Sequence, residues 1–298
     1  MDFRFTEDQQ DLINAAKAFF DGENTVERMR KMAAGEEVAD LWPQFSELGL
    51  LGIMAPESAG GLEQPLVVMA GVAEAAGYAG VSESYVEIAG ITVPHANKDE
   101  LSGPIQRAIR SELRPYIDAS LAKNGEVIDS VDPLRNLVKV KDGNDENAES
   151  ANFHGYVLTA AQLIGLSTRM VDMSVDYAKD RYQFGKPIGS FQAVKHQLAN
   201  VYTQIEFTRP IIHLAAIKGG AAVHNAKVAA IDTAMLAAET AIQVHGGMGY
   251  TYEVDLHLFM KRAWALCGEW GDRNYHMKKL EGYVLNGDAE LGPGQTFA

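Results

Sequence analysis

Apolar residues in the C-terminal half of the chain recur at helical spacing. Leu158, Ala161, Ile164 and Met170 fall on one face and predict a long helix that ends near Asp180. Similar patterns predict further helices at about 189–218, 221–245, 255–267 and 272–285. Glycine pairs follow two of them, and glycine closes helices by adopting left-handed dihedrals. Long helices joined by short glycine-rich turns predict a four-helix bundle.

The N-terminal segment is also helical in pattern. Thr6 and Gln9 fit a capping box, in which each side chain satisfies a free backbone N–H at the helix start. The apolar positions that follow, as far as Phe20, lie on one face. Two more helices are expected at about 39–48 and 65–76, separated by a loop rich in proline and glycine.

Between Ala89 and Ala151 the helical periodicity breaks down. The segments GEVIDSVD (125–132) and NLVKVK (136–141) read as short strands, and KDGNDENAESAN (141–152) reads as a polar connector. The predicted architecture is therefore mainly α. It comprises an N-terminal helical domain (1–90), a short middle β segment (91–151) and a C-terminal four-helix bundle (152–298).

Composition narrows the class of protein. The 298 residues include 26 basic and 40 acidic side chains, a formal net charge of −14. This argues against a nucleic-acid-coating role, because binding to phosphate backbones requires a basic face. The single cysteine, Cys267, excludes an intrachain disulfide. The charged N-terminus does not resemble a signal peptide, and no apolar run reaches the roughly 18 residues of a membrane span. We therefore expect a cytoplasmic protein that binds neither nucleic acid nor membranes.

Two clusters of residues could bind a ligand or take part in catalysis. In KDRYQFGKPIGSFQ (179–192), Arg181 stands at a helix end beside turn N–H groups, which suits a phosphate or pyrophosphate. Spacing alone favours a plainer interpretation, in which basic residues interact with the helix dipole. In QVHGGMGYTYE (243–253), closely spaced glycines allow the backbone to approach a ligand, although on this cluster alone an ordinary helix–helix turn is the favoured explanation.

Other chemistries lack their sequence signals. There is no GxxxxGK[ST] loop and no GxSxG elbow, and no strand precedes the glycine cluster as a dinucleotide-binding fold would require. A di-metal bundle requires Glu-x-x-His pairs, and no histidine has a glutamate three residues before it.

Taken together and in order, the motifs resemble those of the acyl-CoA dehydrogenase family. The resemblance covers about residues 1–80 and 125–285, through LGLLGIMAPESAGG, DYAKDRYQFGKPIGSFQAVKHQLANV and QVHGGMGYTYE. It implies an FAD site to which the C-terminal motifs contribute across a subunit interface. By motif, Arg181, Gln243, Gly246 and Gly247 would meet the FAD diphosphate. Gln183 and Phe184 would line the cofactor, and Gln192 would lie near its adenosine half.

The sequence departs from this family in two ways. The middle segment is shorter than the family's middle domain, and its Thr/Ser flavin-contact motif is missing. Where the family carries its catalytic glutamate, ungapped alignment places Trp270, with Glu269 one residue away. The alternative position on the first long C-terminal helix, NFHGYVLTAA, has no carboxylate. We therefore expect no catalytic base in this chain, with Glu269 as the fallback.

The resemblance thus implies the shortened subunit of a heteromeric, steroid-degradation type of acyl-CoA dehydrogenase. A longer chain, in a heterotetramer with two copies of each subunit, would supply the base and the flavin-ring contacts. The complex would desaturate a bulky acyl-CoA and pass electrons to an electron-transferring flavoprotein. The alternatives are a homo-oligomeric dehydrogenase that uses Glu269 as its base, and a non-enzymatic helical subunit.

Overall fold

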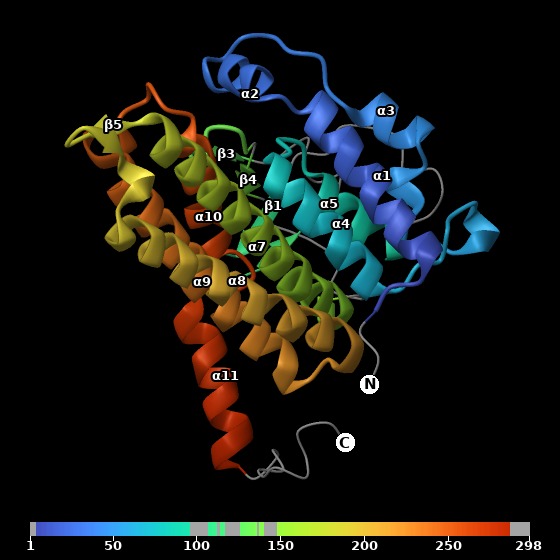
Figure 1. Ribbon diagram of the computed structural model, residues 1–298. Coiled ribbons are helices and arrows are strands. Elements are labelled where there is room, and N and C mark those ends of the chain that lie inside the picture. The colour runs from blue at the N-terminus through green and yellow to red at the C-terminus, as the bar shows by residue number, and fades with distance from the viewer. Residues whose placement is uncertain are drawn as a thin grey trace.

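The computed structural model describes residues 4–95, 107–111, 114–116, 126–135, 137–139 and 148–286. In these residues the protein is mainly α, with a helical N-terminal part packed along one side of a helical C-terminal part and a small sheet beside them (Figure 1). This confirms the predicted fold class. In the described part of the chain, no helix combines the length and apolar character needed to cross a bilayer.

The N-terminal part is a set of helices that share the main core. Its regular helices and short helical turns are α1 (Glu7–Glu23), α2 (Val26–Ala33), α3 (Trp42–Glu47), η1 (Leu50–Gly52), η2 (Glu57–Ala59), α4 (Leu66–Ala79), α5 (Tyr85–Glu87), η3 (Ile88–Thr92) and η4 (Val93–His95). The capping box expected at α1 is present. Thr6 Oγ1 accepts from Gln9 N at 3.3 Å, and Gln9 Oε1 accepts from Thr6 N at 3.1 Å.

Helix α2 and the helical turns after α5 were not predicted. The sequence of α2, VERMRKMA, is mostly polar, and its buried residues are Arg28 and Met29. An apolar-periodicity search misses such a helix because an arginine occupies a core position. Helical structure also continues to His95, which corrects the expectation that it ends near Ala89.

A small sheet represents the described part of the middle segment. It contains β1 (Arg107–Ser111), β2 (Arg114–Tyr116), β3 (Glu126–Ile128) and β4 (Leu137–Lys139), in the order β2-β1-β4-β3. Strands β3 and β4 are antiparallel, whereas β1 and β4 are parallel. Both expected strands, in 125–132 and 136–141, are confirmed. The polar connector is helical from Ala148 onward, and its residues 141–147 lie outside the described part.

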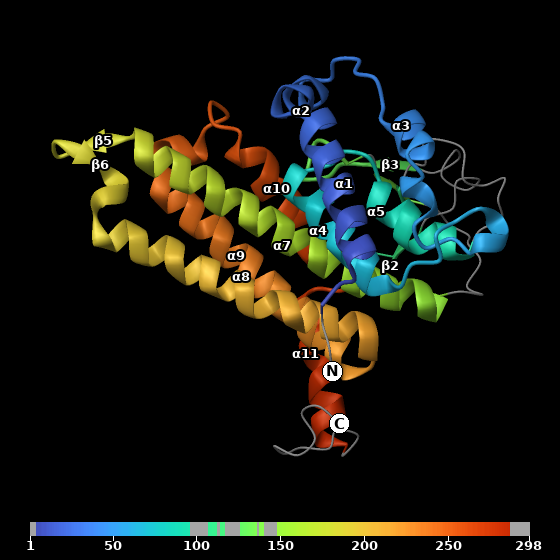
Figure 2. The same ribbon diagram turned by 45° about the vertical axis from the view of Figure 1, so that its right-hand side comes forward.

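The C-terminal part is the expected bundle. Its helices are α7 (Ala148–Asp180), α8 (Gln192–Lys218), α9 (Ala221–His245) and α10 (Leu256–Gly268), and α11 (Arg273–Leu285) projects from it (Figures 1 and 2). The bounds of α9 agree with the prediction because glycine pairs flank it on both sides. Asp272 caps α11, its carboxylate accepting from Tyr275 N at 2.8 Å.

Helices α4 and α7 pack closely and join the two helical parts. A Cβ on Gly77 would lie 2.3 Å from the Gln162 carbonyl oxygen, and one on Gly165 would lie 2.0 Å from the Glu74 carbonyl oxygen. Only glycine permits such backbone contact. One continuous core therefore runs from α1 through α4 and α7 to α9 and α10.

Candidate cofactor site at one end of the bundle

The two motifs predicted to bind a ligand lie at the same end of the bundle. Helix α7 ends at Asp180, and a hairpin of β5 (Tyr182–Gln183) and β6 (Lys186–Pro187) leads through η6 (Ile188–Ser190) into α8. Helix α9 runs in the same direction as α7 and ends in η7 (Gly246–Tyr250). Tyr177 of α7 stacks on His245 of α9, with ring centroids 4.4 Å apart. The chain reversals thus bring together motifs that are separated by about sixty residues of sequence.

The hairpin projects into solvent at the far end of α7 and α8 (Figure 2). Its two-residue turn places Phe184 at φ 54° and Gly185 at φ 80°, as a tight hairpin turn requires. The Phe184 side chain is 91% exposed and meets Phe191 edge-on at 6.1 Å. Lys186 Nζ lies 4.3 Å from the centroid of the same Phe191 ring. The hairpin therefore presents an exposed aromatic ring at its tip.

The predicted cofactor residues are all exposed. This holds for Arg181, Gln183, Phe184, Gln192, Gln243, Gly246 and Gly247. The backbone of Arg181 is fixed, because its N–H donates to Tyr177 O at 2.9 Å and its carbonyl accepts from Ile188 N at 2.8 Å. Within the described residues its guanidinium makes neither a hydrogen bond nor an ion pair. The cation is thus held by its backbone, and its side chain points to solvent.

The glycine loop is open on its outer side. Gly246 has φ 61° and ψ −137°, a combination that side chains disfavour strongly. A Cβ at Gly246 or Gly247 would meet nothing within 4 Å, whereas one at Gly249 would lie 2.8 Å from the Ile242 carbonyl oxygen. Gly249 therefore packs against α9, and the first two glycines leave their backbone accessible.

The fallback base, Glu269, lies in a different place. It follows α10 in the turn before α11, and its carboxylate is 3.3 Å from Arg135 Nη1. Arg135 also donates to Glu87 Oε1 at 3.0 Å, and the three side chains are each less than 10% exposed. Glu269 is thus engaged in a buried ion-pair cluster that joins the β segment to both helical parts.

Trp270, at the position expected for the base, is buried against Gly155. It has φ 57° and is 3% exposed, and a Cβ on Gly155 would lie 2.3 Å from its indole ring. Gly155 belongs to the NFHGYVLTAA segment of α7, the alternative position for a base. The two positions therefore face each other, and an indole fills the space between them.

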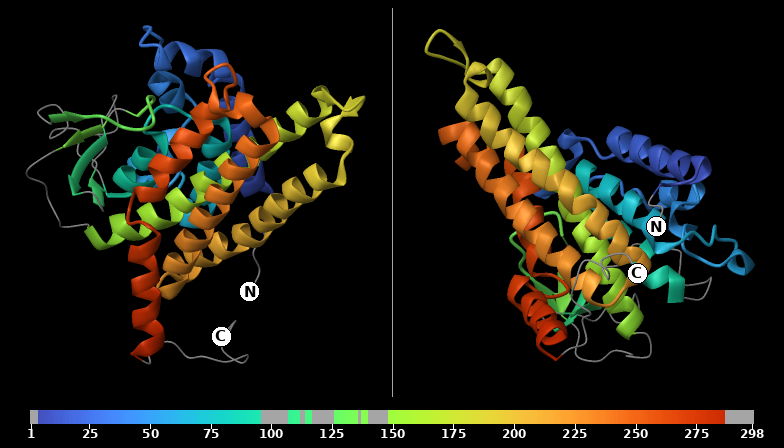
Figure 3. Two further views of the ribbon diagram at one scale, coloured as in Figure 1. Left: turned by 90° about the vertical axis from the view of Figure 1, so that its left-hand side faces the viewer. Right: turned by 60° about the horizontal axis from the view of Figure 1, so that its bottom comes forward.

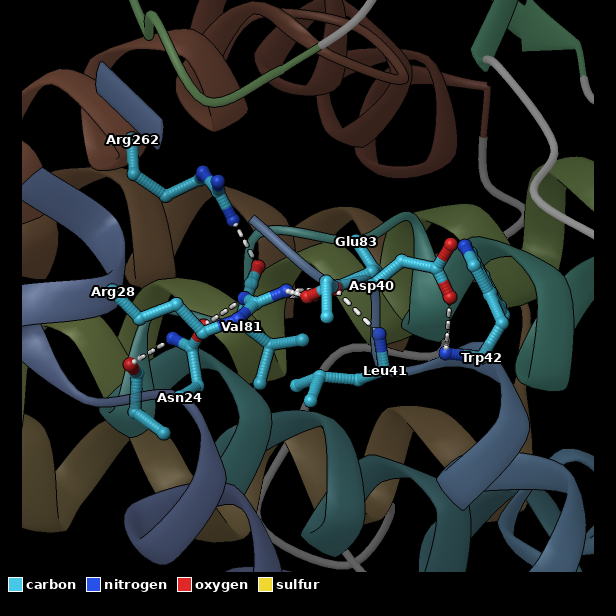
Figure 4. A network of polar contacts seen from close by, with 10 residues as sticks. Asn24, Arg28, Asp40, Leu41, Trp42, Val81, Glu83 and Arg262 are labelled. Carbon is cyan, nitrogen blue, oxygen red and sulfur yellow. Dashed lines mark hydrogen bonds and ion pairs between the residues drawn. The ribbon is translucent and has the colours of Figure 1, made fainter. Parts of the chain in front are cut away.

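A second set of buried charges surrounds a polar pocket between the two helical parts. Arg28 donates to Glu83 Oε1 at 2.5 Å and to Asn24 Oδ1 at 2.8 Å, and Glu83 also accepts from Leu41 N at 3.0 Å (Figure 4). Arg262 of α10 pairs with Asp132 and donates to Val81 O at 2.6 Å. The pocket is lined by Ser82, Glu83, Ser84, Glu87, Arg135, Gln162 and Arg262. This network was not predicted from the sequence because its partners are far apart in the chain. The signal that could have indicated it is Arg262, an arginine within the mostly apolar helix LHLFMKRAWAL.

No group of three or more His, Cys, Asp or Glu side chains suited to a metal ion occurs in the described part of the chain. His224 and His276 approach each other at 2.8 Å between their Nδ1 atoms. His276 Nε2 lies 3.0 Å from the Trp270 carbonyl oxygen, and since a carbonyl only accepts, Nε2 carries the hydrogen. His224 then donates to His276 Nδ1, so the pair links α9 to α11, and the bond from His276 to Trp270 ties α11 to the turn before it.

Family models match most of the chain. The model described as "Acyl-CoA dehydrogenase, N-terminal domain" matches residues 6–96, and the one described as "Acyl-CoA dehydrogenase, C-terminal domain" matches residues 150–278. The chain belongs to the acyl-CoA dehydrogenase family. The predicted membership is thereby confirmed, and both motif clusters lie within the C-terminal match.

Curated relatives within this acyl-CoA dehydrogenase family include two proteins named "Acyl-CoA dehydrogenase IpdE2". The one from Mycolicibacterium smegmatis is 36% identical over 130 residues, covering 43% of this chain and 42% of the relative. The one from Mycobacterium tuberculosis is 36% identical over 151 residues, covering 47% and 45%. The chain therefore matches less than half of the length of these relatives.

Solved acyl-CoA dehydrogenase structures share the fold. A chain of the ChsE4-ChsE5 complex from Mycobacterium tuberculosis superposes with a TM-score of 0.77 at 21% identity, covering 98% of this chain and 100% of that chain. A chain of the Tcur3481-Tcur3483 steroid ACAD G363A variant gives 0.76 at 20% identity, covering 95% and 99%. The first of these is a complex of two differently named proteins, so this fold also occurs in a complex of different chains.

Proposed function

We propose that this chain is a subunit of an FAD-dependent acyl-CoA dehydrogenase that desaturates an acyl-CoA thioester between its α and β carbons. We further propose that a longer partner chain carries the catalytic base. The observation that supports this most directly is that two exposed motifs lie at the same end of the bundle. Arg181 follows α7, and the Gly246–Gly247 loop follows α9.

The donor set fits the diphosphate of FAD. A guanidinium supplies charge-assisted hydrogen bonds to phosphate, and the open backbone of Gly246 and Gly247 allows close approach. Gln192 and Gln243 add neutral amide groups, while Gln183 and Phe184 extend the surface along the hairpin. When bound, FAD would accept the hydride that leaves the β carbon. The residues of this chain would bind and orient the cofactor and exclude water from its diphosphate half.

The exposure of these residues favours a site shared with another subunit. A cofactor needs walls on several sides, because ligand pockets bury most of their ligand's surface. Arg181, Phe184 and Gly247 instead lie on an outward-facing end of the molecule. We therefore propose that the partner provides the remaining walls in a heterotetramer with two copies of each chain.

The surroundings of Glu269 favour a base on the partner. A general base must be within hydrogen-bond reach of the proton that it removes. Glu269 is paired with Arg135 inside the protein, and Trp270 covers the neighbouring Gly155. The partner's carboxylate would therefore take the α-proton, and this chain would contribute cofactor binding.

A bulky, steroid-derived acyl group is the substrate class we propose. The support is the structural likeness to a chain of the Tcur3481-Tcur3483 steroid ACAD. We also propose that the complex works in the cytoplasm and passes electrons to an electron-transferring flavoprotein.

The test is the visible absorption spectrum of the chain, purified alone and co-expressed with its long dehydrogenase-like partner. We expect flavin bands only after co-expression, at about one flavin per pair of chains, as a shared site implies. Arg181→Ala should lower the flavin content of the purified complex by weakening FAD binding, whereas Lys179→Ala, at the same end but paired with Asp176 at the surface, should leave it unchanged. One flavin per chain from this protein alone would instead support the homo-oligomeric alternative with Glu269 as base. Unchanged flavin content in Arg181→Ala would support the non-enzymatic alternative.

A further inference from the structure

A small apolar cluster, separate from the main core, fills the end of the bundle that carries both motifs. Its buried members are Ala178, Leu198 and Val244, one each from α7, α8 and α9. The half-buried residues Val175, Tyr177, Ile188 and Val194 surround it. Val175 also packs against the main core, so the cluster extends the packing of α7, α8 and α9 to the end that carries the two motifs.

Tyr177 and His245 connect this cluster to the two motifs. Their rings stack with an interplanar angle of 27°. Tyr177 lies one helical turn before Arg181, and its backbone carbonyl oxygen accepts a hydrogen bond from the Arg181 N–H at 2.9 Å. His245 directly precedes Gly246. The stack therefore joins a residue one turn before Arg181 to the residue directly before the glycine loop.

The histidine ring is held in one orientation. His245 is 3% exposed, and its Nδ1 lies 2.8 Å from the Ala241 carbonyl oxygen, so Nδ1 carries a hydrogen and donates. Burial lowers the pKa of His245, so the ring that stacks on Tyr177 at neutral pH is uncharged. The ring thus acts through its shape and position, and it supplies no charge to a ligand.

The approach of the hairpin base to α7 fixes the same region from the other side. A Cβ on Gly189 would lie 3.0 Å from the Ala178 carbonyl oxygen. The chain after the hairpin therefore lies against the last turn of α7, next to Tyr177.

We propose that Tyr177 and His245 are positioning residues, whose stack sets the distance between Arg181 and the Gly246–Gly247 loop for a diphosphate held between them. This proposal rests on the proposed function. A binding constellation works when its members are held within about 0.5 Å by side chains that are themselves fixed by packing. Neither ring needs to touch the ligand for its loss to weaken binding.

The test is a double-mutant cycle on the co-expressed complex, with FAD affinity measured by titrating the flavin-free complex. His245→Ala and Tyr177→Leu should each weaken FAD binding about tenfold, whereas Tyr177→Phe, which keeps the ring, should stay within about twofold. In an Arg181→Ala background, His245→Ala should cost less than about twofold, because the positioned cation is already gone. Lys179→Ala serves as the control and should leave the affinity unchanged.

The outcomes separate the two proposals. If Arg181→Ala weakens FAD binding but the ring variants do not, or if His245→Ala and Arg181→Ala are additive, the positioning role is wrong and the cofactor site stands. If Arg181→Ala itself has no effect, the cofactor site is wrong. Tyr177→Leu retains apolar volume, so it keeps the test valid should His245→Ala fail to assemble.

Discussion

Glu269 and Trp270 are neighbours in the turn before α11, and both are removed from solvent in different ways. Glu269 pairs with Arg135, which also pairs with Glu87. Trp270 takes a left-handed backbone that a bulky residue adopts only when its surroundings compensate. Here the compensation is visible, because the indole packs on Gly155 and the Trp270 carbonyl accepts from His276. Both residues therefore stabilise the turn.

Glu269→Gln tests whether this carboxylate has a structural role. Removing one partner of a buried ion pair leaves the other charge uncompensated, and we expect a loss of about 1–3 kcal/mol in unfolding free energy. Glu87 still neutralises Arg135, which keeps the loss moderate. The turnover of the assembled complex should stay within about twofold, because the proposed base on the partner is untouched. Denaturant titration and steady-state kinetics measure the two effects.

Glu87→Gln is the matched control, since it breaks the same cluster from the other side. Its effects should resemble those of Glu269→Gln. A loss of turnover of more than about a hundredfold in Glu269→Gln alone, with stability unchanged, would identify Glu269 as the base.

The buried histidine pair predicts a dependence of stability on pH. Burial, followed by the charge of Lys279, lowers the pKa of His224 to about 4, and burial followed by Lys227 lowers that of His276 to about 3. In the unfolded chain both histidines have a pKa of about 6.5. At pH values between the folded and the unfolded pKa, the unfolded state therefore binds more protons than the folded state. The contribution of the uncharged pair to stability is therefore fully present above about pH 6.5 and decreases as the pH drops toward 4.

We expect the unfolding free energy to be lower at pH 5 than at pH 7, and the His224 contribution to this difference to be about 2 kcal/mol. His224→Gln should lower stability at pH 7 but reduce the difference between the two pH values. Urea titrations at both pH values measure this. An unchanged difference would show that the pair does not govern the acid side of the stability profile.

At the scale of elements, helices with clear boundary residues were predictable, and those defined by tertiary contacts were not. Helix α9 lies between two glycine pairs, and α11 starts at a capping aspartate, so local chemistry marks their ends. Helix α2 buries Arg28, whose guanidinium meets Glu83 from a distant loop. No local pattern reports such a partner. The two motifs proposed to bind a ligand were recognisable one by one, but the Tyr177–His245 contact that joins them depends on the bundle.

The crossing of α4 and α7 makes an element-scale prediction. Gly165→Ala places a methyl group 2.0 Å from the Glu74 carbonyl oxygen, so the helices must separate. Overpacking of this kind costs about 1–3 kcal/mol or more, and here the obstacle is backbone that cannot rotate away. Thermal or urea unfolding should show the loss.

Gly22→Ala provides the matched control in α1. A Cβ there meets nothing within 4 Å, and alanine is favoured over glycine in a helix by up to about 1 kcal/mol. The control should therefore be neutral or stabilising. Similar losses in both variants would mean that α4 and α7 do not form this close contact.

At the scale of the whole molecule, buried charges join regions that are distant in the sequence. Arg262 of the bundle pairs with Asp132 beside the sheet and donates to Val81 O of the N-terminal part. Arg135 connects Glu87 and Glu269 in the same way. The sheet is seen on the side away from the hairpin in each view (Figure 3). The buried charges next to the sheet therefore stabilise the scaffold, and the proposed cofactor end stays free for a partner.

A double-mutant cycle on Arg262 and Asp132 distinguishes a required charge pair from a replaceable one. Arg262→Met leaves Asp132 as an uncompensated buried carboxylate, and breaking such a pair costs about 3–5 kcal/mol. Asp132→Asn leaves the Arg262 cation unpaired but keeps an oxygen for Leu134 N, which donates to Asp132 Oδ1 at 3.0 Å. The double variant removes both charges, so we expect it to recover at least about 1 kcal/mol relative to the sum of the single losses. Strict additivity in denaturant titrations would show that the two side chains do not act as a pair. If the double variant recovers unfolding free energy and still unfolds in one cooperative transition, packing along α4 and α7 holds the two helical parts together. The charges would then mainly fix the position of the sheet.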